Sequence, residues 1–135
     1  MAEQRIPKLY TVAEARELVD KLRPILIEIR ALRREIADHS AILRTLSPEM
    51  RGNGHAADVS RREDRVSRCI ELIGRRLGEI EELDIEVKDI ETGLVDFFSL
   101  RDGRVVYLCW AVDEPTIAYW HEINAGFRGR QPLDP

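Results

Sequence analysis

Two stretches of the chain repeat apolar side chains at alternating spacings of three and four residues. This pattern is typical of helices packed lengthwise on each other. The first stretch has nine such positions over residues 18–46, eight of them aliphatic and the ninth His39. The second has nine over residues 66–94, with two consecutive spacings of three near its middle. Because apolar seams of this length must be buried, the chain is limited to folds in which two long helices lie side by side.

Helix-start signals set the expected bounds of these two helices. Thr11 and Glu14 form a capping box ahead of the first seam, and Ser60 and Glu63 form one ahead of the second. A glycine-rich loop signal separates the two helices, so they are expected to run antiparallel. We predict a coiled-coil-like helical hairpin over residues 1–93, with helices over about 11–46 and 60–92.

The apolar period changes to two after Gly93, which is typical of β-strands. A tight Asp-Gly turn and an Asp-Glu-Pro turn divide this part into three expected strands, over residues 94–100, 104–111 and 116–122. We therefore predict an α+β fold, in which a three-stranded antiparallel β-meander with a C-terminal tail, over residues 94–135, follows the hairpin.

Composition excludes several classes of protein. The longest uninterrupted apolar run covers residues 105–112, whereas a membrane-spanning helix needs about 20 residues. The N-terminal stretch has no apolar segment of signal-peptide length, and the two cysteines lack the spacing of a CxxC site. We therefore expect a cytoplasmic protein with reduced thiols and no membrane partner.

Several short segments carry a family resemblance. The opening YTVAEAREL, together with DGRVVYLCW, DEPTIAYWHE and AGFRGR, resembles a prokaryotic family described as domain of unknown function 2203. Two positions depart from the family pattern, with Phe98 in place of a frequent proline and Asp113 in place of a glycine. The family has no established activity. The resemblance therefore implies a small cytosolic prokaryotic protein and transfers no catalytic residue.

Turn lengths predict which side chains share a face of the sheet. The two-residue turn places Asp96 opposite Cys109, and a three-residue second turn places His121 diagonal to Cys109 on the same face. These three side chains are candidates for a nucleophile with its base and orienting acid, or for three ligands of a metal ion. A second turn one residue different in length moves His121 to the opposite face. The competing interpretation is a half-buried sheet face with ordinary packing.

Two weaker candidate sites lie elsewhere in the chain. Arg128 and Arg130 flank a glycine and offer guanidinium groups to an anion, whereas pairing of Arg130 with an acid such as Glu114 is the competing interpretation. Glu35 and His39 lie one helical turn apart and are weaker metal candidates. A single polar residue in an apolar seam more often fixes helix register or oligomeric state, so His39 is expected to do this.

Charge is unevenly distributed along the predicted hairpin. Residues 30–76, nearest the loop, contain 11 arginines and 7 acidic residues, whereas the rest of the chain carries a net charge of −8. The overall charge of −4 thus combines a basic hairpin tip with an acidic remainder. Tip-to-base packing of two hairpins would pair these charges, so we expect a homo-oligomer, either a dimer or a four-helix assembly.

Three hypotheses for function follow from different features. The leading one is a cytosolic oligomerising or protein-interaction module built on the hairpin. The second is a metal-binding protein or thiol-dependent enzyme that uses the Cys/His/Asp cluster, with a metal ion as the cofactor. The third is nucleic-acid binding through the basic hairpin tip. This third hypothesis is disfavoured because the tip has no aromatic residue to stack on bases.

Overall fold

The computed structural model describes residues 6–46, 48–52 and 54–133, and its fold is α+β. The helices precede the strands along the chain, and a short 3₁₀ helix, η1, lies between the last two strands. The elements are α1 (Val12–Thr45), α2 (Pro48–Gly52), α3 (Ala56–Glu81), β1 (Ile85–Asp89), β2 (Leu94–Arg101), β3 (Arg104–Ala111), β4 (Tyr119–Glu122), η1 (Phe127–Gly129) and β5 (Gln131–Pro132).

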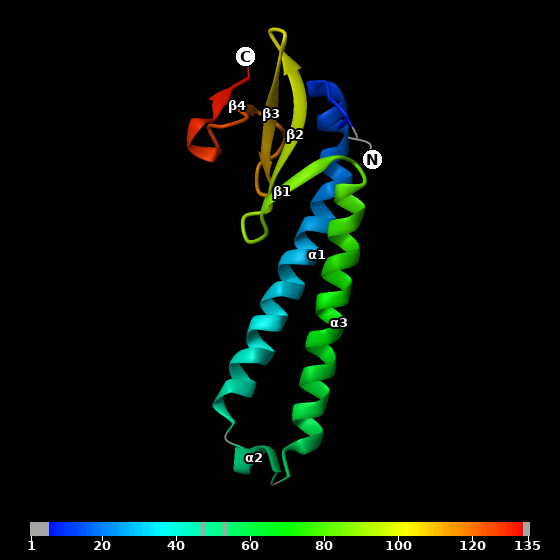
Figure 1. Cartoon of the computed structure of the whole chain (residues 1–135), viewed down its shortest axis with the longest axis vertical. Coiled ribbons are helices and arrows are strands. Elements are labelled where there is room, and N and C mark those ends of the chain that lie inside the picture. Colours follow the sequence, from blue (N-terminus) through cyan, green and yellow to red (C-terminus); the bar gives the residue numbers. More distant parts are fainter. Residues whose placement is uncertain (1–5, 47, 53, 134–135) are drawn as a thin grey trace, which may run out of the picture.

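The two long helices, α1 and α3, lie side by side and run in opposite directions, with α2 at their far end (Figure 1). The start of α1 is fixed by the expected capping box. The Thr11 hydroxyl accepts the Glu14 amide at 3.1 Å, and the Glu14 carboxylate accepts the Thr11 amide at 2.9 Å. An N-cap of this kind contributes about 1 kcal/mol. The centre of the connecting loop, Asn53, lies outside the described residues.

The predicted second helix, over residues 60–92, is wrong at both ends. It begins at Ala56 without a side-chain cap, so Ser60 and Glu63 lie inside α3 rather than at its start. It ends at Glu81, and Asp84 then adopts a positive φ of 60° that redirects the chain into β1. The last three positions of the apolar seam therefore belong to the sheet and its turn. The two consecutive spacings of three in the sequence coincide with this change from helix to strand.

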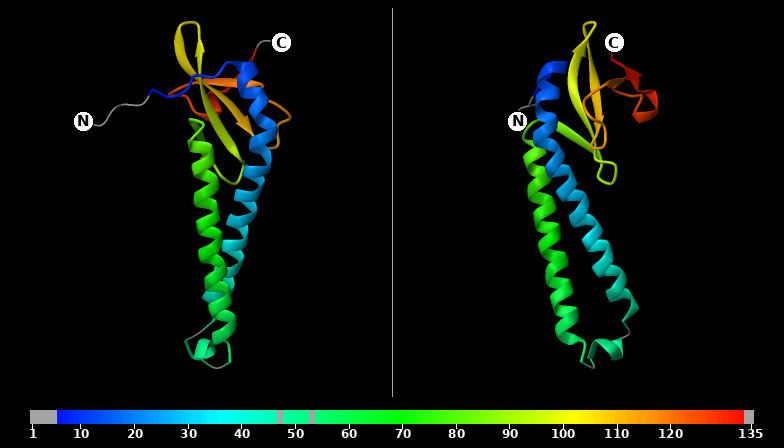
Figure 2. Two further views of the ribbon diagram at one scale, coloured as in Figure 1. Left: turned by 90° about the vertical axis from the view of Figure 1, so that its right-hand side faces the viewer. Right: turned by 180° about the vertical axis from the view of Figure 1, so that it is seen from behind.

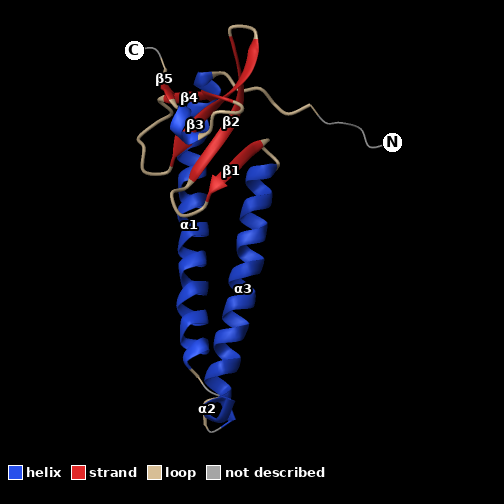
Figure 3. Ribbon diagram, turned by 60° about the vertical axis from the view of Figure 1, so that its left-hand side comes forward, coloured by secondary structure: helices blue, strands red, loops and turns tan. Residues whose placement is uncertain are grey.

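Within the described residues, the sheet has five antiparallel strands in the order β1-β2-β3-β4-β5, so the prediction of three strands is wrong (Figure 3). The two additional strands are β1, which was expected to be helical, and the short β5 in the tail. The predicted pairings of the central strands are confirmed, whereas the strand predicted over residues 116–122 begins only at Tyr119. Asp96 lies opposite Cys109 in the β2–β3 pair, and Tyr107 lies opposite His121 in the β3–β4 pair.

One face of the sheet packs on the N-terminal half of α1, and both long helices extend beyond the sheet as a rod (Figure 2). The centre of this core consists of Phe97, Leu108 and Trp110 from the sheet, all nearly inaccessible to solvent. The buried positions of α1 are Ala15, Val19, Leu22, Leu26, Ile29 and Leu32. Some of these lie beside the predicted seam because the sheet covers a second stripe of the helix. The opposite face of the sheet points away from α1.

Among the helices that the structure describes, none combines the length and the apolarity that crossing a membrane requires.

Candidate functional site

Three central strands bring Asp96, Cys109 and His121 to the face of the sheet that points away from α1. The register places Asp96 directly opposite Cys109, and His121 on the next strand is diagonal to Cys109, as predicted. One ligand atom from each side chain lies within 4.8 Å of the others. All three residues are at most 2% exposed. The sequence-predicted cluster is thus assembled inside the protein rather than on its surface.

Two hydrogen bonds fix the orientation of the His121 ring. Its Nδ1 atom lies 2.8 Å from the backbone carbonyl of Glu122, and its Nε2 atom lies 3.1 Å from Oδ1 of Asp96. Because a carbonyl oxygen can only accept, Nδ1 carries a proton. The second bond also requires a proton, so Asp96 and His121 share one between them. Nε2 therefore faces the cluster, in the orientation that metal-binding histidines use.

Burial controls the protonation of the other two side chains. It raises the pKa of Asp96, although the neighbouring His121 and a hydrogen bond from the Cys109 thiol oppose the shift. Burial, reinforced by the nearby Asp96 carboxylate, raises the pKa of Cys109 to about 12. At neutral pH Cys109 is therefore a thiol and not a thiolate, which weighs against its use as a nucleophile. A bound divalent cation reverses this preference because it stabilises the thiolate directly.

A second layer of polar contacts surrounds the cluster. The Tyr107 ring lies 5.3 Å from the His121 ring, and its hydroxyl donates to a Glu86 carboxylate oxygen at 3.0 Å. Lys88 forms an ion pair with Glu86, and its amino group lies 5.0 Å from the centre of the Tyr107 ring. Sequence patterns did not indicate Glu86 and Lys88 as neighbours of the cluster, because they predicted a helix over residues 60–92. The alternation of Ile85 and Val87 was the available signal for a strand.

A cavity of about 190 Å³ adjoins two of the three side chains. It is bounded by strands on one side and by the segment that follows β4 on the other. Its lining residues are Lys88, Leu94, Asp96, Tyr107, His121, Ile123, Gly126 and Phe127. The cavity has room for water or a small ligand beside the cluster.

Of the two residues of the predicted anion site, Arg128 and Arg130, the second already binds a carboxylate of the same chain. Arg130 donates to both carboxylate oxygens of Glu114, at 2.7 and 2.8 Å, and its guanidinium lies 4.0 Å from the centre of the Tyr119 ring. The competing interpretation, a pair between Arg130 and Glu114, is confirmed. Arg128 is exposed on η1. The Arg130–Glu114 pair instead fastens the tail to the turn after β3.

Glu35 and His39 form part of a polar layer between the two long helices. Arg65 donates to Glu35 at 2.9 Å and holds the pKa of that carboxyl near 2. His39 Nδ1 lies 3.2 Å from an Arg62 nitrogen, and its Nε2 lies 3.5 Å from Glu35. Among the described residues, one group of three potential metal ligands is found, and it consists of Asp96, Cys109 and His121. Glu35 and His39 do not belong to such a group. The weaker metal candidates are thus held by arginines of α3.

Comparison with known proteins identifies the family. The model of the family described as "Uncharacterized conserved protein (DUF2203)" matches residues 8–133. The chain belongs to this family. DUF2203 membership confirms the resemblance seen in the sequence, and the family's description names no activity. No curated protein and no solved structure matches the chain. The geometry of the site is therefore the basis for inferring function.

Proposed function

We propose that the chain is a metal-binding protein that holds Zn²⁺ between Asp96, Cys109 and His121. The observation that carries the proposal is the convergence of three buried donors from three strands within 4.8 Å. Zn²⁺ accepts thiolate sulfur, imidazole nitrogen and carboxylate oxygen together, and it favours a compact tetrahedral arrangement. The Nδ1–H bond to Glu122 supports this role because it turns Nε2 of His121 toward the other two donors.

Charge balance also favours a divalent cation at this position. Uncompensated charge is costly to bury, and Asp96 and Cys109 are both buried. A carboxylate and a thiolate together carry two negative charges, which Zn²⁺ neutralises. The loaded site has no net charge, whereas either anion alone in the same place is disfavoured. The raised pKa values of Asp96 and Cys109 apply to the metal-free site.

Three protein ligands leave one position of a tetrahedral ion open. Structural zinc sites are closed by four protein ligands, whereas sites that bind water or a small molecule keep a position free. The cavity beside Asp96 and His121 provides the space for such a ligand. The proposal therefore extends to an exchangeable site that presents a metal-bound water to the cavity.

Metal content is the direct test of this proposal. Protein purified without a tag and supplied with Zn²⁺ is expected to retain about one zinc per chain, measured by inductively coupled plasma mass spectrometry. Cys109→Ser removes the thiolate and is expected to lose most of it. Cys69→Ser is the matched control, because Cys69 is also fully buried but lies on α3. Equal zinc in the two variants, or none in the wild-type protein, contradicts the proposal.

A spectroscopic measurement separates binding at this cluster from binding elsewhere. Loading the protein with Co²⁺ in place of Zn²⁺ is expected to give thiolate-to-cobalt charge-transfer absorption, since a Cys109 sulfur would be in the coordination sphere. The same band is expected in Cys69→Ser and not in Cys109→Ser. Stoichiometric cobalt without this band places the ion away from Cys109.

A further inference from the structure

The first strand of the sheet, β1, has a neighbour on one side and a groove on the other. It begins the strand order and pairs with β2. A groove of about 680 Å³ is lined by all five residues of β1. Successive side chains of a strand point to opposite faces, so a groove that touches every one of them follows the edge of β1 that pairs with no other described strand. This edge carries backbone groups that another strand can pair with.

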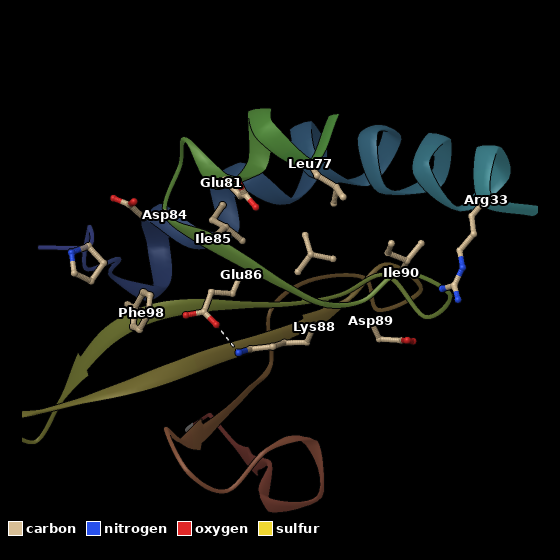
Figure 4. A pocket seen from close by; sticks show the side chains of 12 residues that line it. Arg33, Leu77, Glu81, Asp84, Ile85, Glu86, Lys88, Asp89, Ile90 and Phe98 are labelled. Atoms are coloured by element: carbon tan, nitrogen blue, oxygen red, sulfur yellow. Dashed lines mark hydrogen bonds and ion pairs between the residues drawn. The ribbon is translucent and has the colours of Figure 1, made fainter. Parts of the chain in front are cut away.

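The long helices form the second wall of this groove. Figure 4 shows Leu77 of α3 and Arg33 of α1 extending toward β1 and the turn that follows it. Apolar side chains at Leu77, Val87 and Ile90 lie along the helix side of the groove and pack partly against the main core. An open strand edge beside an apolar shelf is the arrangement in which an added strand is bound, through backbone hydrogen bonds and through alternate side chains.

Glu86 and Lys88 of β1, which form an ion pair within one chain, are also complementary between two antiparallel copies of the strand. Pairing centred on Val87 places Glu86 of each copy opposite Lys88 of the other, so two-fold symmetry creates the same ion pair twice. Both charged side chains lie on the face that carries Tyr107. Val87 packs on the helix side and meets its own counterpart. Opposite charges directly across from each other stabilise strand pairs, whereas like charges destabilise them.

We propose that two copies of the chain associate by antiparallel pairing of their β1 strands, which joins their sheets into one continuous sheet. The strand is five residues long, and its pairing with β2 shifts between Val87 and Asp89. These features limit the number of backbone bonds across the interface, so the dimer is expected to dissociate on dilution. The proposal goes beyond the metal site and does not depend on it.

A charge-exchange experiment tests this interface. Sedimentation velocity over a concentration series is expected to show the 15.6 kDa chain forming a dimer at high concentration. Lys88→Glu and Glu86→Lys each place like charges across the interface at two positions, and each is expected to weaken self-association roughly tenfold. Mixing the two variants restores opposite charges, so a heterodimer of near wild-type affinity is expected. Lys21→Glu changes an exposed charge on α1 and serves as the control.

Each outcome decides for or against the proposal. A wild-type protein that stays monomeric at every concentration overturns it, and so does a dimer that neither variant weakens. A mixture that remains as weakly associated as its components also overturns it. The double variant Glu86→Lys/Lys88→Glu covers the case in which one single variant does not fold, because it is expected to dimerise like the wild type. Zinc content measured on the same samples tests the metal proposal separately.

Discussion

Replacing Gly93 with alanine is expected to destabilise the protein by about 2–5 kcal/mol. Gly93 has a positive φ of 64°, which costs an L-residue about 1–2 kcal/mol. An added Cβ would also lie 2.7 Å from both Cβ and Cγ1 of Val112, so backbone or side chain must move. That movement strains the 3.1 Å hydrogen bond from the Val112 amide to the Gly93 carbonyl. Overpacking of this kind typically costs a further 1–3 kcal/mol.

Gly103→Ala is the matched control for this prediction. Gly103 also has a positive φ, 77°, but an added Cβ there meets nothing within 4 Å. Urea unfolding, followed by far-ultraviolet circular dichroism, is expected to show the smaller loss for Gly103→Ala. Gly93→Ala is expected to cost less when it is made in the Val112→Ala variant, because the contact with Cγ1 of Val112 is then absent. Equal losses in the two glycine variants would refute the contact between the β1–β2 turn and Val112.

Three further predictions concern the site and its surroundings. The folded-state pKa of Cys109, about 12, lies above the ordinary value of 9.0, so its contribution to stability is complete below about pH 9 and is lost as the pH rises toward 12. Metal-free wild-type protein is therefore expected to lose stability over this range more steeply than Cys109→Ser in thermal unfolding, and parallel curves would contradict this. Binding Zn²⁺ displaces the proton of the Cys109 thiol, so competition with a chelator is expected to show zinc affinity rising at least about tenfold per pH unit near neutrality; a zinc affinity that does not change with pH would contradict a thiolate ligand. Glu114→Ala removes the carboxylate that pairs with Arg130 and is expected to lower the free energy of unfolding in urea by about 2 kcal/mol. The effect is expected to be this large because the Arg130 and Glu114 side chains are only 13% and 24% exposed. A loss below about 0.5 kcal/mol would show that the pair does not fasten the tail.

The helices were predictable to different degrees. The Thr11 capping box defined the start of α1 because its signal is local in sequence. The end of α3 was predicted too late in the chain. The apolar spacings typical of a helix continue through β1, where the same side chains are also compatible with a strand. Asp84 adopts a positive φ that ends the helix, and pairing with β2 then stabilises the following residues as a strand. Tertiary pairing of this kind is not encoded in a local period.

The candidate site was predictable because turn length determines register. The tight turn at Asp102 and Gly103 fixed Asp96 opposite Cys109. The Cys109–His121 relation was predicted from a three-residue turn, and its register is confirmed although residues 112–118 connect β3 to β4. Glu86 and Lys88 were missed with the strand that carries them. The cavity and the orientation of His121 depend on the tail and on the Glu122 carbonyl, so no spacing in the sequence could indicate them.

Self-association through the hairpin remains a prediction. The structure uses part of the opposite charge within the chain, since Arg65 contacts Glu35 and Arg76 contacts Glu28 across the two helices. These exposed pairs contribute little individually. Because these side chains are paired within the chain, fewer charges remain to pair with a second hairpin. The proposed pairing of β1 strands does not use these helix surfaces.

The zinc-edge X-ray absorption spectrum of the loaded protein shows directly whether a cysteine sulfur binds the ion. One sulfur ligand is expected at about 2.3 Å, with nitrogen and oxygen ligands at about 2.0–2.2 Å. The sulfur contribution is expected to persist in Cys69→Ser and to disappear in Cys109→Ser. A wild-type spectrum with no sulfur ligand, or with a sulfur contribution that survives Cys109→Ser, would contradict a metal site at Asp96, Cys109 and His121.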